Sequence, residues 1–242
     1  MENRDVFRPR GQLAKEIDCA ERYPDFVVSA LQHYLSEERR QRIETVIAHR
    51  TNRLSLALDG LTDPHNTAAV IRTADAFGVQ LVQVIESKAK FVSSRKVTQG
   101  SHKWVDFAVW TSPEIFAAAM KKKGIAMFVA EATAKKSVYE LTLTGPTVVV
   151  FGNEHEGVSA VVAEQAAGSF SIPMFGFVDS INVSAAAAVT LAALRQGGQG
   201  DLSAPELKVL RARFYLRAVR AGLDIVMLEL KKQNSASLGL LG

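Results

Sequence analysis

Three polar clusters, each beside an apolar segment, contain the side chains of this chain that could do chemistry. They are Asp63–Gly78 (DPHNTAAVIRTADAFG), Val148–Ser159 (VVVFGNEHEGVS) and Ile172–Leu194 (IPMFGFVDSINVSAAAAVTLAAL). Their amides, hydroxyls, carboxylates and guanidinium can hold phosphate, orient a ligand or stabilise charge on an oxygen atom. The chain has no G-x-G-x-x-G loop of the dinucleotide-binding or Rossmann-methyltransferase kind, so a cofactor site is expected in the C-terminal loops instead.

Arg72 and Asn66 are the two side chains of the first cluster that need an explanation. At about 100° per residue, Arg72 lies roughly 200° from Val70, away from the apolar stripe of a predicted helix over Asn66–Phe77. Arg72 is therefore either a surface charge, paired with Asp75, or a group that faces a site. Asn66 follows the tripeptide DPH and could simply be the N-cap of the helix.

The third cluster leads into a predicted helix, Asn182–Gln196, that is apolar on nearly every side. Such a helix must be buried on every side. We therefore expect the polar side chains of Ser180, Asn182 and Ser184 at the N-terminal end of this helix, where backbone N–H groups have no partner within the helix. The small residues of the helix also allow another backbone to pass close to it.

The second cluster contributes Glu154, which follows an apolar strand at the edge where ligands meet parallel sheets. Its carboxylate could orient Asn66 or Arg72, or accept a hydrogen bond from RNA. The run Glu154-His155-Glu156 does not predict a metal site, because adjacent side chains point in different directions and no metal-ligand spacing supports one. The single cysteine, Cys19, excludes an internal disulfide and a cysteine-based zinc site, and it is interpreted as an inert thiol.

The order of the elements indicates an α/β fold with a mainly parallel sheet and helices on both faces. The segment TVVVFG is a continuous apolar run, typical of a strand that is buried on both faces. The predicted strands are Leu54–Asp59, Val79–Glu86, Val105–Trp110, Ile125–Ala130, Thr147–Gly152 and Ser169–Ile172. The predicted helices are Pro24–Leu35, Ser36–His49, Asn66–Phe77, Pro113–Lys123, Ser159–Ala167, Asn182–Gln196 and Ala204–Ala221.

Three parts are expected along the chain: a helical N-terminal extension (1–53), a catalytic domain (54–197) and a basic, helical C-terminal extension (198–242). Residues 1–20 are expected to be an ordered arm at best, and Ser235–Gly242 is expected to fray. The net charge is +4, and residues 203–242 carry seven basic and three acidic side chains. This imbalance suits an RNA-facing appendage.

A basic stripe is expected on the helix Ala204–Ala221. Arg213, Arg217 and Arg220 follow i, i+4, i+7 spacing and would meet RNA phosphates, while the apolar face docks on the catalytic domain. A solubilising face or a dimer contact is the alternative. Two interpretations also remain for the three arginines of the predicted helix Ser36–His49, which form either a solvated helix face or an auxiliary contact with RNA.

The three clusters together resemble, in order, the signature motifs of the SpoU/TrmH family of RNA 2′-O-ribose methyltransferases, in the SPOUT superfamily. The resemblance runs from about Leu54 to Gln196 and implies a C-terminal trefoil knot, which physical reasoning alone would not predict because knots are nearly absent among folds. Glycines at 152, 157 and 176 suit the sharply bent loops of such a knot. The segment Gly100–Val105 (GSHKWV) is most similar to the branch that modifies guanosine-18 of tRNA.

The resemblance implies S-adenosylmethionine as cofactor and a homodimer in which the apolar helices pack across the interface. Matching the motifs residue by residue implies cofactor contacts from Ala130, Gly152, Ile172, Ile181 and Asn182. It implies catalytic roles for Asn66, Arg72, Glu154, Ser180 and Asn182. Arg72 would act on the ribose 2′-hydroxyl, more easily by holding phosphate and stabilising an alkoxide than as a base, because a guanidinium keeps its proton. His102 and Lys103 would face tRNA, although His102 and Trp104 could also be simple packing residues.

We therefore expect an S-adenosylmethionine-dependent 2′-O-methyltransferase that acts on guanosine-18 of tRNA. A ribosomal RNA ribose is the alternative substrate, and a non-catalytic RNA-binding module on the same fold is the rival class. A chain that had become a non-catalytic RNA-binding module would be expected to have lost Asn66, Arg72 or Asn182 first, and all three are present. No apolar run approaches the ~18–20 residues of a membrane span, and the charged start lacks a secretory signal. A cytoplasmic protein without a membrane or DNA partner is expected.

Overall fold

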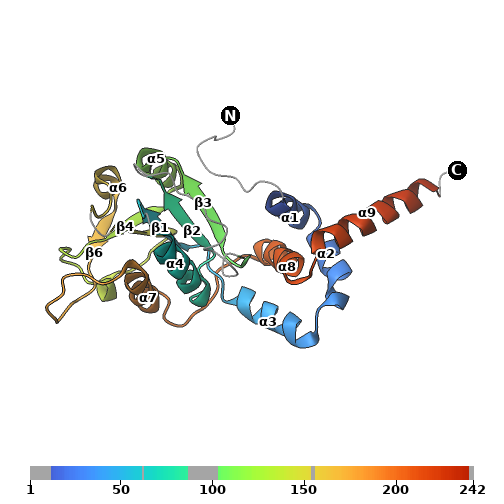
Figure 1. Cartoon of the computed structure of the whole chain (residues 1–242), viewed down its shortest axis with the longest axis horizontal. Helices are drawn as coiled ribbons and strands as arrows, with labels where there is room; N and C mark the ends of the chain where they lie inside the picture. The colour runs from blue at the N-terminus through green and yellow to red at the C-terminus, as the bar shows by residue number, and fades with distance from the viewer. Residues whose placement is uncertain (1–11, 62, 87–102, 154–155, 240–242) are drawn as a thin grey trace. The chain divides into compact units, whose positions relative to one another are not determined.

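The computed structural model describes residues 12–61, 63–86, 103–153 and 156–239 (Figure 1). The chain forms two compact units. The α/β unit contains Arg50–Asp201, and the helical unit combines residues from both ends of the chain, 8–49 and 202–242. The functional division into 1–53, 54–197 and 198–242 stays a proposal. Among the helices of the described residues, none is long and apolar enough to cross a membrane.

The α/β unit is built on a six-stranded sheet in the order β3-β2-β1-β5-β4-β6, and every pairing is parallel. The strands are β1 (Leu54–Asp59), β2 (Leu81–Ile85), β3 (Asp106–Trp110), β4 (Ala126–Ala130), β5 (Thr147–Phe151) and β6 (Gly168–Phe170). The central strands β1 and β5 are buried along their whole length, as their apolar sequences predict. The predicted α/β fold class is confirmed, and the trefoil knot stays a prediction.

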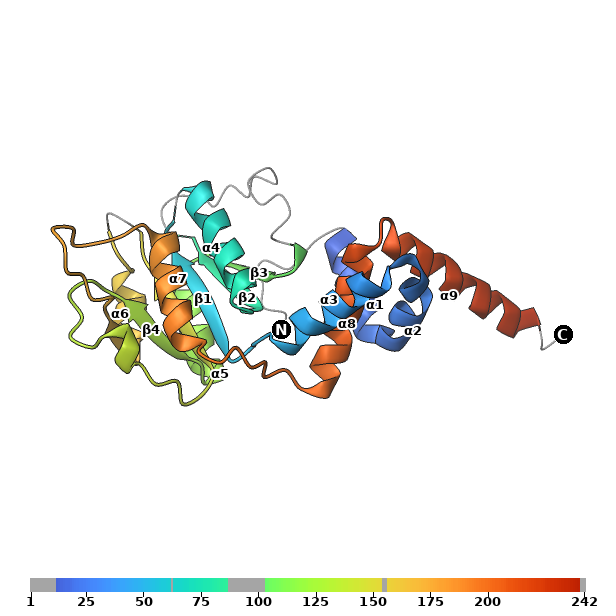
Figure 2. The same ribbon diagram turned by 90° about the horizontal axis from the view of Figure 1, so that it is seen from below.

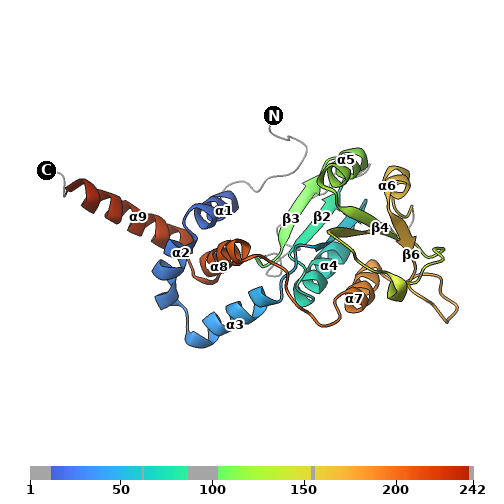
Figure 3. The same ribbon diagram turned by 180° about the vertical axis from the view of Figure 1, so that it is seen from behind.

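Helices cover both faces of this sheet, with α4 and α7 on one face and α5 and α6 on the other (Figures 1 and 3). They are α4 (Pro64–Ala76), α5 (Pro113–Lys123), α6 (Ala160–Gln165) and α7 (Val183–Leu194). Successive side chains of a strand point to opposite faces. In β5, Val149 packs under α4 and α7, whereas Val148 and Val150 pack under α5 and α6. The two hydrophobic clusters fix both helical layers to the same strands.

Local signals in the sequence determine where several of these helices begin. The α5 helix begins after Ser112, whose hydroxyl accepts from Ile115 N, and ends at Gly124, which has φ +65°. The α4 helix begins at Pro64, because Asp63 is its N-cap and accepts from His65 N at 2.8 Å. The interpretation of Asn66 as the N-cap is therefore wrong, and Asn66 lies within the first turn instead.

The α4 and α7 helices are tied together at both ends. At their N-terminal ends, Asn182 Nδ2 donates to Asn66 Oδ1 at 2.9 Å. At their C-terminal ends, Arg195 Nε donates to the carbonyl of Phe77 at 3.1 Å. Burial lowers the pKa of Arg195, and nearby Asp201 opposes that shift. These two hydrogen bonds hold α4 and α7 side by side as a parallel pair.

The helical unit combines the N-terminal and C-terminal extensions (Figure 2). Its elements are α1 (Gln12–Arg22), α2 (Pro24–Leu31), the 3-10 turn η1 (Gln32–Tyr34), α3 (Glu37–Ala48), α8 (Ala204–Ala218) and α9 (Gly222–Gly239). The expectation of no more than an arm over residues 1–20 is wrong for residues 12–20, which lie in α1, and residues 1–11 lie outside the described residues. The α9 helix continues to Gly239, so part of the segment expected to fray is helical, and residues 240–242 lie outside the described residues.

The apolar face of α8 is buried inside the helical unit. Leu210 and Phe214 are 3% and 1% exposed, and α8 packs against α1, α2 and α3. This corrects the expectation that this face docks on the catalytic domain. Arg211 reinforces the packing through a two-pronged ion pair with Glu44, at 2.6 and 2.7 Å, and this hydrogen bonding raises the pKa of Arg211.

Candidate active site

A cavity of about 550 Å³ lies at the carboxyl ends of β4, β5 and β6. Ala130 borders it at the end of β4, Gly152 follows β5, Ile172 follows β6, and Ile181 precedes α7. Four of the five residues expected to contact the cofactor thus line one cavity, together with Ser180. Asn182, the fifth, lies between the lining residues Ile181 and Val183.

The wall of the cavity combines apolar side chains and loop backbone with a few carboxylates. The acidic lining residues are Glu131, Glu156 and Asp179. A mostly apolar concave surface of this volume, with a few polar groups, is typical of a small-molecule site. Among the described residues of the wall there are carboxylates but no lysine or arginine, which favours a ligand that carries positive charge.

Gly152 is at a point where two backbone segments cross too closely for any side chain. A Cβ atom at Gly152 would lie 2.1 Å from the carbonyl carbon of Gly157 and 2.3 Å from Val158 N. The backbones of Asn153 and Gly157 exchange hydrogen bonds at 3.1 and 3.0 Å, and Gly157 has φ +70°. A glycine at 152 is therefore a steric requirement of the loop that borders the cavity.

This loop is also anchored to the carboxyl end of β1. Asn153 Nδ2 donates to the carbonyl of Gly60 at 3.2 Å, and Ser159 N donates to Asp59 Oδ2 at 2.8 Å. Asp59 is 2% exposed. The sequence interpretation missed Asp59, and the available signal was a carboxylate at the end of the otherwise apolar strand LSLALD.

Asn182 links the mouth of α7 to the helix that carries Arg72. Its Oδ1 accepts from Ser184 N at 2.8 Å and caps α7, while its Nδ2 donates to Asn66 Oδ1. Arg72 follows Asn66 by six residues, which is about 9 Å along a helix axis. The structure thus brings Asn66 and Asn182 together, puts Ser180 on the cavity wall, and places Arg72 further along α4.

Arg72 is exposed, and among the described residues its guanidinium has no hydrogen bond or ion pair. The alternative of an Arg72–Asp75 pair is wrong, because Asp75 pairs with Arg50 instead. Arg72 is therefore available to an incoming anion. Glu154, the remaining predicted catalytic residue, lies outside the described residues.

The predicted RNA-facing residues differ in exposure. Lys103 and Arg220 are exposed, Arg213 is partly buried, and His102 lies outside the described residues. The side chain of Arg217 is only 8% exposed, and its Nε lies 3.8 Å from Glu16 Oε2 of α1. The expectation of one exposed helical stripe is corrected twice: α1 covers Arg217, and Arg220 lies outside α8, which ends at Ala218.

Neither a metal nor a reactive thiol is indicated by the described part of the chain. Within it, no three His, Cys, Asp or Glu side chains come together as a metal site. Cys19 is 4% exposed in α1, and burial, together with the charge of Asp18, raises the pKa of its thiol. A protonated, buried thiol is a poor nucleophile.

The family model described as the SpoU rRNA Methylase family matches residues 53–192, which is more than half of the chain. The chain belongs to this family. The tRNA (guanosine(18)-2′-O)-methyltransferase of Thermus thermophilus is 38% identical over 162 residues, covering 64% of this chain and 81% of that one.

Solved structures similar to this chain include a tRNA modifying enzyme and an rRNA methyltransferase. The TrmH/SpoU tRNA modifying enzyme of A. aeolicus superposes with a TM-score of 0.65 at 30% identity, over 76% of this chain and 98% of that one. The AdoMet-bound rRNA methyltransferase of Sinorhizobium meliloti gives a TM-score of 0.55 at 26% identity, over 60% of this chain and 56% of that one. The family resemblance is thus confirmed, and the roles of individual site residues stay predictions.

Proposed function

We propose that this chain is an S-adenosylmethionine-dependent RNA methyltransferase that modifies a ribose 2′-hydroxyl, with guanosine-18 of tRNA as the substrate nucleotide. The observation that carries the proposal is the cavity at the ends of β4, β5 and β6, joined through the Asn182–Asn66 hydrogen bond to the helix of Arg72. A pocket for a small cofactor and an exposed guanidinium are the two parts that such a transfer needs.

The cavity fits S-adenosylmethionine in size and in chemistry. Ala130, Ile172 and Ile181 offer apolar contact to a purine ring, and the backbone around Gly152 can approach the ligand closely because no Cβ intervenes. The acidic lining suits a sulfonium and an ammonium group. When bound, the cofactor supplies a methyl group on a positively charged sulfur, and the chain's own task is to orient the ribose oxygen toward it.

Arg72 would hold an RNA phosphate and stabilise the negative charge that develops on the 2′-oxygen as this atom takes the methyl group and its proton passes to water. A guanidinium does not normally give up its own proton in a protein, so electrostatic stabilisation is the role that its chemistry allows. Asn182 and Ser180 would hold the cofactor loop in one conformation, and Asn66 would fix the position of that loop relative to α4. Glu154 remains a proposed partner of Asn66 or Arg72.

The tRNA substrate is favoured over ribosomal RNA by how much of each relative the chain spans. It covers 81% of the T. thermophilus enzyme and 98% of the A. aeolicus chain, both named for tRNA, but 56% of the S. meliloti rRNA enzyme. The likeness to the tRNA enzymes thus extends over most of their length, whereas the likeness to the rRNA enzyme is confined to about half of it. Lys103 and Arg220 are the exposed cations that we assign to RNA phosphate, with Arg213 at the margin.

A homodimer is part of the proposal. The outward side of α7 carries Ala185 and Ala192, both exposed, and the loop before it carries Phe175 and Phe177, which are fully exposed. Apolar surface beside a catalytic cavity is better covered by a second copy than by water. An enzyme that modifies tRNA works where tRNA is, so we also infer a cytoplasmic location.

The test is methyl transfer itself, measured with the purified full chain, S-adenosylmethionine and separate tRNA and ribosomal RNA pools. Nucleoside analysis of the products should show 2′-O-methylguanosine in tRNA, and RNA from a deletion strain should lack it at position 18. Methyl groups in rRNA alone would support the alternative substrate. Cofactor binding without transfer to either pool would support the non-catalytic RNA-binding module.

A further inference from the structure

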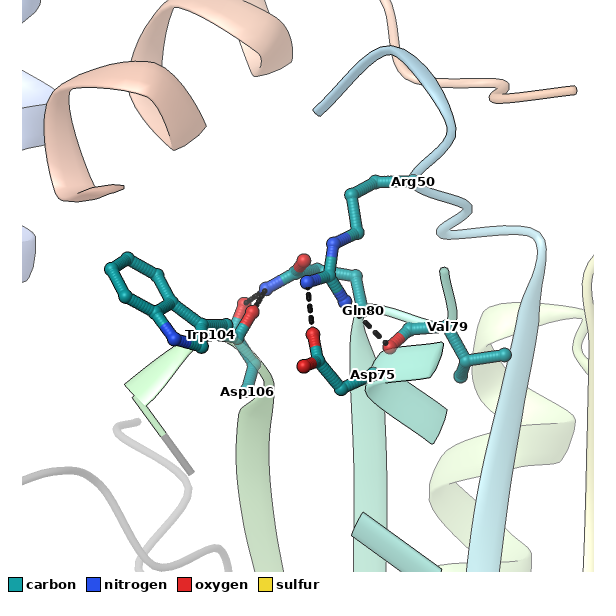
Figure 4. Close-up of polar contacts among 6 residues, drawn as sticks. All are labelled: Arg50, Asp75, Val79, Gln80, Trp104 and Asp106. Atoms are coloured by element: carbon teal, nitrogen blue, oxygen red, sulfur yellow. Dashed lines mark hydrogen bonds and ion pairs between the residues drawn. The ribbon is translucent and has the colours of Figure 1, made fainter. Parts of the chain in front are cut away.

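Arg50 is a fully buried arginine with a carboxylate partner on the helix of Arg72. It precedes β1, is 0% exposed, and pairs through Nη2 with Asp75 of α4. Its Nη1 also donates to the carbonyl of Val79 at 3.4 Å (Figure 4). The side chain of Asp75 is one-third exposed, so this ion pair reaches from the interior of the α/β unit to its surface.

Asp75 is also the natural partner of Arg72. The two residues are three apart on α4, and side chains at this spacing are neighbours on a helix surface and pair when their charges are opposite. In the structure, however, Asp75 turns to Arg50, and Arg72 has no ion pair among the described residues. Asp75 therefore has two possible arginine partners, and it pairs with the buried one, Arg50.

The difference in free energy between an Arg50–Asp75 pair and an Arg72–Asp75 pair explains why Asp75 binds Arg50. A buried guanidinium without a counter-charge is strongly unfavourable, whereas an exposed ion pair contributes little. Asp106, another carboxylate in this region, accepts from Gln80 Nε2 at 3.2 Å, and the same amide donates to the carbonyl of Trp104 at 3.2 Å (Figure 4). The structure thus commits Asp75 to Arg50.

We propose that Arg50 is a positioning residue for methyl transfer: by holding and neutralising Asp75, it keeps the Arg72 guanidinium free for the RNA phosphate and the developing alkoxide. The inference rests on the proposed function, because it assumes that Arg72 acts on RNA. In this proposal a buried residue, remote from the cofactor cavity wall, determines how much positive charge Arg72 offers to the RNA substrate.

The experiment compares Arg50→Met with the double variant Arg50→Met/Asp75→Asn in the tRNA methylation assay. Methionine keeps an apolar stem but frees Asp75 to pair with Arg72 and to repel phosphate. The kcat of Arg50→Met should fall about three- to tenfold, the range set by one exposed ion pair and one unneutralised carboxylate. Cofactor affinity, measured by calorimetry, should stay unchanged. The double variant should recover most of the kcat, since it has no carboxylate at position 75.

Two readouts separate this role from a merely structural one. The deficit of Arg50→Met should shrink as salt rises, because an exposed Arg72–Asp75 pair is screened. In an Arg72→Ala background, Arg50→Met should cause no further loss of kcat, because its effect passes through Arg72. A loss that asparagine at position 75 does not rescue, or that is independent of salt, would overturn the proposal. An active wild type whose Arg72→Ala variant is equally active would instead refute the proposed role of Arg72 itself.

Discussion

Replacing Gly152 with alanine should damage the cofactor cavity through sterics alone. The added methyl group would lie 2.1 Å from the carbonyl carbon of Gly157, and ordinary van der Waals contact begins at 3.4 Å. The backbone of Gly157 and Val158 must therefore move by more than about an ångström, because the atoms that the new methyl group meets are backbone atoms rather than flexible side chains. Overpacking of this kind costs about 1–3 kcal/mol.

That cost should appear in two measurements on Gly152→Ala. If the cost destabilises the folded chain without cofactor, the unfolding temperature falls by about 2–4 °C per kcal/mol for a protein of this size. If cofactor binding absorbs it, the dissociation constant for S-adenosylmethionine, measured by calorimetry, rises about 5- to 150-fold. We expect most of this free-energy cost to appear as weaker cofactor binding, because the backbone that must move borders the cavity.

Gly176→Ala is the matched control. Gly176 lies in the loop before α7, has no positive φ, and a Cβ atom added to it would meet no heavy atom within 4 Å. Its replacement should leave both the unfolding temperature and the cofactor affinity near the wild-type values. A Gly152→Ala protein that matches the wild type in both measurements would refute the reasoning, since it would mean that the two backbone segments do not cross as described.

Three further substitutions test the assigned roles. Arg72→Ala should lower kcat about 100-fold or more, as for a lost transition-state donor, with cofactor affinity by calorimetry intact. Asn182→Ala removes the donor to Asn66 and the cap of α7, and it should weaken cofactor binding or stability by about 1–3 kcal/mol. Arg220→Gln should reduce the salt slope of tRNA binding by about one phosphate contact, whereas Arg217→Gln, beside Glu16, should mainly lower the unfolding temperature.

The α/β core could be predicted because its signals are local. A run such as TVVVF has no polar face to expose and must be a buried strand, as β5 is. The α5 helix carries its own start in Ser112-Pro113 and its own stop in Gly124, so its bounds follow from capping chemistry. The start of α4 shows the limit of such signals, because Asp63 and Asn66 are both good caps and Pro64 decides in favour of Asp63.

The helical unit could not be predicted in the same way, because its stability depends on contacts between the two ends of the chain. The sequence of α1 is charged and looks independent of any core, yet Cys19 and Ala20 are buried. Arg217 looks like a surface cation in a basic stripe until α1 brings Glu16 beside it. Partners about 200 positions apart leave no periodic signal in either segment.

The candidate site was predictable only in part. The motifs indicate that Ala130, Gly152, Ile172 and Ile181 belong to one site, and the structure gathers all four around one cavity. The distribution of hydrogen bonds was not predictable, since Asp75 faces Arg50 rather than Arg72, and Asp59 anchors the loop after β5. Such choices depend on burial, which a sequence pattern does not specify for single polar residues.

The central claim, transfer of a methyl group to one ribose oxygen, can be tested with two tRNA transcripts that differ by a single atom. One carries guanosine at position 18 and the other 2′-deoxyguanosine, and both are incubated with the purified chain and labelled S-adenosylmethionine. We predict about one methyl group per molecule of the first transcript and none on the second, with similar binding of both. Equal methylation of the deoxy transcript would contradict the claim, because the accepting atom would then not be the 2′-oxygen of that nucleotide.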